Sequence, residues 1–267
     1  MIGKLFGAPK RAATPALSAA QRQWSEAMRG SAGAPEPANP AADAGADAAA
    51  GSVANSAADP LAAAKIGGRE VFHRLYAAMK NERGVHVESM LCVLGALAGY
   101  ACQAEVRAIA LAKNLPDDAV FQIVSAIDGR RYYFGELLNQ PLLHAQPSLW
   151  GMVAAAATQA GAAALPDPHA LFRHVAASVG SDAFGVPRVP TRHKAGDTPR
   201  GYLKQLWPAL FPLVRKLCPD PALWPVVFGV AIGHTIEAGQ GTIDPALAFT
   251  IVMEAAVPMS KVDLEGA

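Results

Sequence analysis

A histidine and a glutamate three residues apart are the first side chains that could do chemistry. His234 and Glu237 (GHTIEAG) fall at positions i and i+3 of a predicted helix, so they share one face. Di-metal centres of the ferritin-like type need such a pair from each of two helices and further glutamates. Here the pair occurs once and in reversed order, although Glu88 and Glu254 occur in other apolar helices. We predict no metal site and no cofactor, and keep His234, Glu237 and Glu88 as candidate catalytic residues.

A cluster of bases forms the second candidate site, in a long segment rich in Gly, Pro and charge between residues 180 and 200. Its sequence RVPTRHKAGDTPRGYLK contains one acid, Asp197. Guanidinium groups bind phosphates and carboxylates through paired hydrogen bonds, so the cluster predicts a site for an anion or for an acidic partner segment. The simpler interpretation is a solvated loop. The predicted binding residues are Arg188, Arg192, His193, Lys194, Arg200 and Lys204.

The common enzyme signatures are absent from the sequence: there is no phosphate-binding glycine loop, nucleophile elbow, dinucleotide fingerprint or Cys-x-x-Cys pair. Cys92, Cys102 and Cys218 lie in apolar segments and are predicted to be buried free thiols of a reducing compartment. The N-terminus lacks the apolar run of a secretory signal, so we expect a cytoplasmic protein. The Ala- and Gly-rich composition is typical of a bacterial genome of high GC content.

Charge is distributed unevenly along the chain. Residues 1–30 carry about +4 by count, residues 31–64 about −4, and the remainder about +1. A nearly neutral domain disfavours specific nucleic-acid binding, which needs a basic excess. Residues 1–11 (MIGKLFGAPKR) match a short peripheral membrane anchor, but a secretion leader or a docking peptide explains them equally well.

The composition divides the chain into three parts. Residues 1–30 are predicted to be a peptide with a short amphipathic helix, on which Leu17, Trp24 and Met28 share one face. Residues 31–66 are rich in Ala, Pro and Gly and are predicted to be a disordered linker. Residues 67–264 show helical periodicity and are predicted to fold as a compact, mainly α domain with one small antiparallel β-hairpin.

Two apolar stretches, at residues 90–102 and 222–236, are shorter than the ~20 residues of a membrane crossing, so both are predicted to be buried core helices. Gly95 and Gly99 are four residues apart in the first, where a neighbouring helix could approach closely. Three Asp-Pro pairs precede apolar runs and predict helix starts, as Ser148 does. The pairs begin at Asp167, Asp220 and Asp244. Pro208 and Pro212 are expected to kink or divide another helix.

The β-hairpin is predicted at about residues 119–134, where apolar and other residues alternate around Asp128-Gly129, a pair that favours a two-residue type I′ turn. Because an isolated hairpin is marginally stable, we expect it to pack on the helices or gain a third strand. The segment EVRAIALA at residues 105–112 is the candidate for that strand. Of the adjacent Tyr132 and Tyr133, one is expected in the core and the other at the surface.

These patterns predict a non-catalytic adaptor or accessory protein. Its N-terminal peptide and its folded domain would engage different protein partners across the linker. The alternative is an enzyme of unrecognised class that acts on an anionic small molecule. Its pocket would lie between the hairpin and the helices, and it would act through the basic loop and a His/Glu pair. No motif indicates an oligomeric state.

Overall fold

The computed structural model describes residues 60–127 and 129–264. The N-terminal peptide, its helix and most of the expected linker lie outside these residues. The elements follow in the order α2 (Pro60–Met79), α3 (Val87–Ala112), α4 (Asp117–Val120), β1 (Gln122–Ser125), β2 (Arg131–Phe134), α5 (Glu136–Asn139), the π-helix η1 (Gln140–His144), α6 (Leu149–Gln159), α7 (Pro168–Ser178), the 3-10 helix η2 (Thr191–His193), α8 (Pro199–Leu217), the 3-10 helix η3 (Pro221–Leu223), α9 (Trp224–Ala238) and α10 (Pro245–Met259). The folded part is therefore mainly α with one two-stranded antiparallel sheet, as the sequence predicts.

The first described helix begins earlier than the expected domain boundary. α2 starts at Pro60, so residues 60–66 are helical and do not belong to a linker that ends at residue 66. Pro60 follows Asp59 in the sequence, the same pair of residue types that precedes three later helices. Proline supplies a helical φ at the first position, so this fourth Asp-Pro pair marks the start of the domain.

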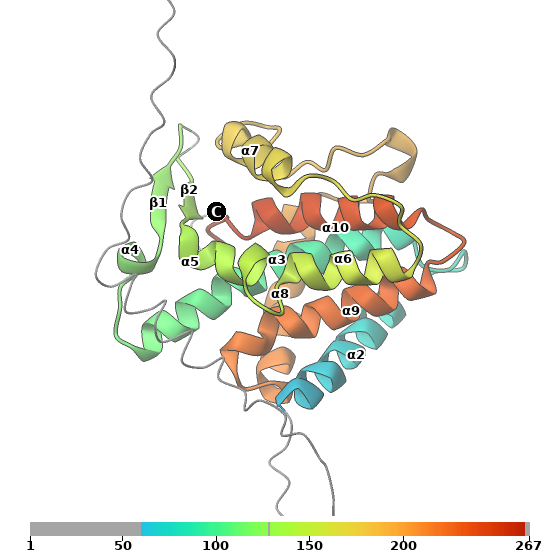
Figure 1. Cartoon of the computed structure of the whole chain (residues 1–267), viewed down its shortest axis with the longest axis horizontal. Coiled ribbons are helices and arrows are strands. Elements are labelled where there is room, and N and C mark those ends of the chain that lie inside the picture. The colour runs from blue at the N-terminus through green and yellow to red at the C-terminus, as the bar shows by residue number, and fades with distance from the viewer. Residues whose placement is uncertain (1–59, 128, 265–267) are drawn as a thin grey trace, which may run out of the picture. The chain divides into compact units, whose positions relative to one another are not determined.

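Helix α3 forms the centre of the domain and packs against α10, α9 and α8 (Figure 1). It is long and apolar enough to cross a membrane, but 83% of its most apolar window is buried by the rest of the domain. The second predicted core helix corresponds to η3 and α9, and α9 is also largely buried. Both stretches are therefore core elements of this fold, as expected.

The close approach predicted at Gly95 and Gly99 occurs, and the neighbouring helix is α10. A Cβ atom on either glycine would collide with the α10 backbone, at Val252 and Ala256 respectively. The two glycines allow the central helices to lie backbone to backbone. Larger residues would push α10 away from α3 and open the core.

The hairpin forms where it is predicted, with a different turn. Val124 lies opposite Tyr132 and Ser125 opposite Arg131. The amide of Ala126 donates to the carbonyl of Arg130 at 3.0 Å, so the hairpin closes at this pair and not at Ile127 with Arg130. Gly129 has φ 75°, as in three-residue loops that end on a left-handed glycine. The expected two-residue turn is thus wrong by one residue, because Asp-Gly suits both loop lengths.

The segment that pairs with the hairpin is not the predicted one. Residues 105–112 continue helix α3, since six of these eight residues (Glu, Arg, Leu and three Ala) are good helix formers. The hairpin pairs instead with the C-terminal segment, through an antiparallel bridge between Tyr132 and Val262. The Tyr133 amide donates to the Lys261 carbonyl at 2.8 Å. Figure 1 shows the chain leaving α10 and ending beside β2.

Both tyrosines of β2 are buried, so the expectation of one buried and one exposed ring is wrong. Tyr132 packs against Phe184 in the loop after α7, and Tyr133 packs against Phe121. The guanidinium group of Arg107 lies over the Tyr133 ring at 4.3 Å from its centroid. Each face of the strand is therefore covered, one by the loop and the other by α3 and the residue before β1.

The predicted helix starts are confirmed. The side chains of Asp167, Asp220, Asp244 and Ser148 each accept hydrogen bonds from backbone amides in the first turns of α7, η3, α10 and α6. Helix α8 is not divided at Pro208 and Pro212. Both prolines are exposed on one side of α8, so the carbonyls that lose their intrahelical donors can bond to water.

Candidate functional site

The basic loop is held on the domain by two buried or partly buried carboxylates. Arg188 binds Glu254 of α10 through Nε at 2.9 Å and Nη2 at 2.6 Å, both to Oε1. The Glu254 side chain is 8% exposed, whereas that of Arg188 is 46% exposed. Charged hydrogen bonds of this kind fix a side chain in place. Arg188 therefore anchors the loop and is not a free anion-binding group.

The second anchor joins the loop to the N-terminal end of α3. His193 Nδ1 lies 2.9 Å from Glu88 Oε1, and His86 Nε2 lies 3.3 Å from Glu88 Oε2. Partial burial raises the pKa of Glu88, but the hydrogen bond to His193 and the charge of the nearby His86 outweigh it, and the pKa lies below its usual value. Glu88 is thus an ionised partner of two histidines.

Backbone contacts complete the docking of the loop. The Gly196 amide donates to Ser89 Oγ at 2.9 Å, and the same oxygen lies 2.8 Å from His86 Nδ1. Two residues later Thr198 caps α8, its hydroxyl accepting from the Gly201 amide at 3.0 Å. The first turn of α8 is consequently fixed relative to the first turn of α3.

Four of the six predicted binding residues remain available on this surface. The Nε of Arg192 donates to His193 Nε2 at 3.0 Å, which leaves the terminal nitrogens of its guanidinium group. Lys194 and Lys204 are exposed and Arg200 is half-buried, and none of these three is in an ion pair within the described part of the chain. The structure therefore brings Arg192, Lys194, Arg200 and Lys204 to one end of α8 and uses Arg188 and His193 for support.

Helix α8 extends this basic surface beyond the predicted residues. It contains Arg200, Lys204, Arg215 and Lys216 and no acid, while its apolar side packs into the core. Lys204, Arg215 and Lys216 are exposed. Arg215 and Lys216 were not among the predicted binding residues, because the prediction rested on the loop and the first turns of the helix that follows it. The feature of the sequence that could have identified these two bases is the absence of any acid over the 19 residues of α8.

The candidate catalytic residues do not converge. His234 and Glu237 are paired on α9, with Nδ1 and Oε2 3.7 Å apart, and the Glu237 side chain is 76% exposed. The ring of His234 lies 5.7 Å from that of Phe72 on α2. Glu88 is engaged with the two histidines of the loop anchor. No hydrogen bond or ion pair joins the two groups within the described residues.

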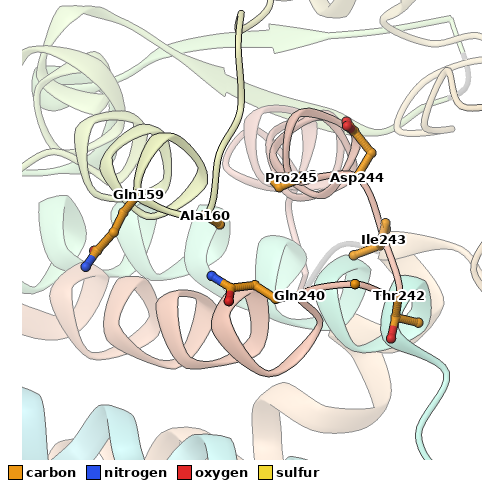
Figure 2. Close-up of a pocket in the computed structure, with 8 residues that line it drawn as sticks. Gln159, Ala160, Gln240, Thr242, Ile243, Asp244 and Pro245 are labelled. Carbon is orange, nitrogen blue, oxygen red and sulfur yellow. The ribbon is translucent and has the colours of Figure 1, made fainter.

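An open depression of about 590 Å³ lies where α6 and α9 end and α10 begins (Figure 2). The amide side chains of Gln159 and Gln240 are on its walls. Asp244 is occupied with its helix cap, since it accepts from the Leu247 amide at 2.9 Å. The depression includes none of the candidate catalytic residues, and its lining offers no nucleophile with a general base beside it.

A second group of ionisable residues is buried along the C-terminal half of α3. Lys261 is 2% exposed, and its ammonium group lies over the rings of Phe134 and Phe172, 5.6 and 5.7 Å from their centroids. Burial lowers the pKa of Lys261 to about 7. Burial, together with Asp220, raises the pKa of Glu105 well above its usual value.

The three cysteines are buried free thiols, as predicted. Burial raises the pKa of each thiol, that of Cys92 to about 12, and nearby carboxylates add to the shift. Thiols of this kind stay protonated and are poor nucleophiles. Within residues 60–127 and 129–264, no three His, Cys, Asp or Glu side chains are grouped so that they could hold a metal ion.

Comparison with known proteins adds no family to these observations. No protein-family model, no curated protein sequence and no solved structure matches the chain.

Proposed function

We propose that this chain is a non-catalytic adaptor or accessory protein whose folded domain binds an acidic segment of a protein partner. The observation that carries the proposal is the basic surface of α8 and the loop before it. This surface presents Arg192, Lys194, Lys204, Arg215 and Lys216 to solvent, and α8 itself contains no acid. Residues 65–267 sum to only about +1, so acids elsewhere in this range offset the bases of this surface.

The way the loop is held supports a binding role. Two anchors, Arg188 to Glu254 and His193 to Glu88, fix the loop before a partner arrives. A preformed surface loses less conformational entropy on binding than a mobile one, which strengthens the complex. Exposed bases also increase the association rate with an acidic partner.

An enzymatic role has less support from the geometry. The residues predicted for catalysis lie in two separate groups, and Glu88 is used to hold the loop. The N-terminal peptide of residues 1–30 remains a prediction from sequence. In our proposal it binds a second partner, and the adaptor brings the two partners together.

The proposal is tested with a fluorescent peptide of about 16 alternating Glu and Ser residues, which offers charge and no apolar contact. Fluorescence anisotropy with the full chain at low salt should show binding that weakens as salt is added. The triple variant R192A/K194A/K204A should bind about tenfold more weakly or worse.

A matched control replaces three exposed bases on other elements, as K80A/K113A/R173A. The control variant should bind within about twofold of the wild type, because its bases lie outside the proposed surface. Equal losses in both variants, or no binding of the peptide at low salt, would overturn the proposal.

A further inference from the structure

A groove of about 380 Å³ runs between α2 and α8. Its apolar residues are Ile66 of α2 and Leu213 and Leu217 of α8, and its bases are Arg69, Arg74 and Lys216. Ile66 is 60% exposed, one of the more exposed large apolar side chains of the described chain. The apolar residues of the groove are therefore accessible from solvent and flanked by positive charge.

The groove exists because of the way α2 packs. A Cβ atom on Gly68 would lie 2.6 Å from the Val227 carbonyl oxygen and 2.6 Å from Val230 Cβ, so this glycine lets α2 lie directly on α9. Figure 1 shows α2 alongside α9. Close packing on α9 turns the neighbouring side of α2, with Ile66 and Arg69, away from the core. That side and the last turns of α8 form the two walls.

The charges around the groove are not balanced by the described residues. Arg74 is paired with Glu70, its Nε 2.6 Å from Oε1, in an exposed i, i+4 ion pair. Arg69 and Lys216 are in no ion pair within the described residues. Two unpaired cations beside three apolar side chains fit a partner that offers apolar groups between carboxylates.

We infer that this groove binds one amphipathic helix of a protein partner, with two or three leucine-like side chains in the groove and glutamates or aspartates against Arg69 and Lys216. The inference rests on the proposed function, because it specifies the acidic partner that α8 binds. Side chains of one helix pack between those of two neighbouring helices, and apolar residues at i, i+4 and i+7 would follow the groove. Charge fixes the orientation, and apolar burial supplies most of the affinity.

Other anionic partners fit less well. Phosphates of a nucleic acid or a membrane would leave the apolar residues of the groove uncovered. The apolar side of α8 is buried in the domain, with Leu203, Trp207 and Val214 in the core, so the apolar surface that α8 could offer to lipid is limited to Leu213 and Leu217 in the groove.

The test uses a fluorescein-labelled synthetic helix of about 18 residues with leucines at i, i+4 and i+7 and glutamates elsewhere on that side. The full chain should bind it about tenfold or more tightly than a peptide of the same composition with the leucines scattered around the helix. The I66S and K216E variants should each lose about tenfold in affinity, because they remove an apolar contact and reverse one charge. Their matched controls are L111S, which changes an exposed leucine elsewhere (76% exposed), and K80E, which reverses an exposed base that belongs neither to the groove nor to the basic surface of α8.

The outcomes separate this inference from the proposed function. Loss of binding by I66S and K216E, with L111S unchanged and unaltered circular dichroism, supports the groove. If the leucine peptide binds no better than the scattered one, or if I66S binds it normally, the groove inference is overturned. The proposed function then still stands when the Glu-Ser peptide binds through Arg192, Lys194 and Lys204. Binding of anionic vesicles or duplex DNA that depends on Lys216 and not on Ile66 would also overturn the inference.

Discussion

The two ends of helix α3 place a glutamate in opposite environments. Glu88, near the start, has two histidines within 3.3 Å and a pKa below its usual value. Glu105, near the end, is 3% exposed, its Oε2 has no hydrogen-bond partner among the described residues, and its pKa is raised. Both residues lie on the same helix, yet one holds a loop in place and the other is a buried acid with a raised pKa.

The difference shows that neighbouring groups, and not burial alone, decide whether the pKa of a carboxylate on α3 is raised or lowered. Burial raises the pKa of both glutamates. At Glu88 the neighbouring histidines and backbone offset this effect, whereas at Glu105 the nearby Asp220 adds to it. A paired carboxylate contributes stability, while an unpaired buried one reduces stability whenever the pH would ionise it. The buried end of α3 should therefore show the larger pH effects.

The largest effect is expected from Lys261→Met at the buried end. The unfolded lysine has a pKa near 10.5 and the folded one about 7, so between these values the unfolded chain holds more protons and stability rises with pH. Below pH 7 the wild type carries the full cost of the buried charge, on the order of 5 kcal/mol at about 1.4 kcal/mol per pKa unit. Urea unfolding at pH 6, 8 and 10 should show that the variant lacks this rise and is the more stable protein at pH 6.

The control for this measurement is Lys216→Met, which changes an exposed lysine of α8. Its unfolding free energy should follow the wild type at each pH. A Lys261→Met variant whose stability rises with pH as steeply as the wild type would contradict the role assigned to the buried amine.

A smaller effect is expected from Glu105→Gln. The folded pKa of Glu105 is raised, so above pH 4.5 the unfolded chain loses a proton that the folded chain keeps, and wild-type stability falls as pH rises. Glutamine stays neutral and removes this fall. At pH 8 the variant should be more stable than the wild type by about 1 to 3 kcal/mol, and near pH 4 the two should be similar. Glu82→Gln, at an exposed position, should leave the pH profile unchanged.

The smallest effect on stability is expected at the start of α3, where Glu88 is paired with two histidines. Glu88→Gln removes the charge that holds His193 and His86, and should cost about 1 kcal/mol at pH 7. Because the folded pKa of Glu88 is lowered, its contribution is present above pH 4.5 and is lost as pH falls through the folded pKa. Hydrogen exchange at residues 186–198 should become faster in the variant. Unchanged exchange there, or an equal change in the exposed Glu237→Gln control, would show that Glu88 does not anchor the loop.

The sequence predicted much of the local structure correctly. Aspartate before proline marked three helix starts, and Ser148 marked a fourth, because a cap needs only its own side chain and the next few amides. Gly95 and Gly99 marked the close approach of a helix, although the sequence could not show that α10 supplies it. The hairpin was placed correctly, but its loop was one residue longer than expected.

The candidate site was predicted only in part. Composition located the basic loop, yet nothing local could show that Arg188 and His193 would meet Glu254 and Glu88, which lie 66 and 105 residues away. The groove depends on α2 meeting α8 through their common neighbour α9. The segment around Val262 that bridges to β2 likewise comes from the far end of the chain.

By itself the sequence determined that the fold is mainly α with one hairpin and where several of the helices begin, because capping, propensity and apolar periodicity act within a few residues. Only the tertiary structure decided which charges pair, which are buried and which face solvent. Those outcomes depend on how α3 is surrounded by distant segments, and both pairing and desolvation are set by that packing.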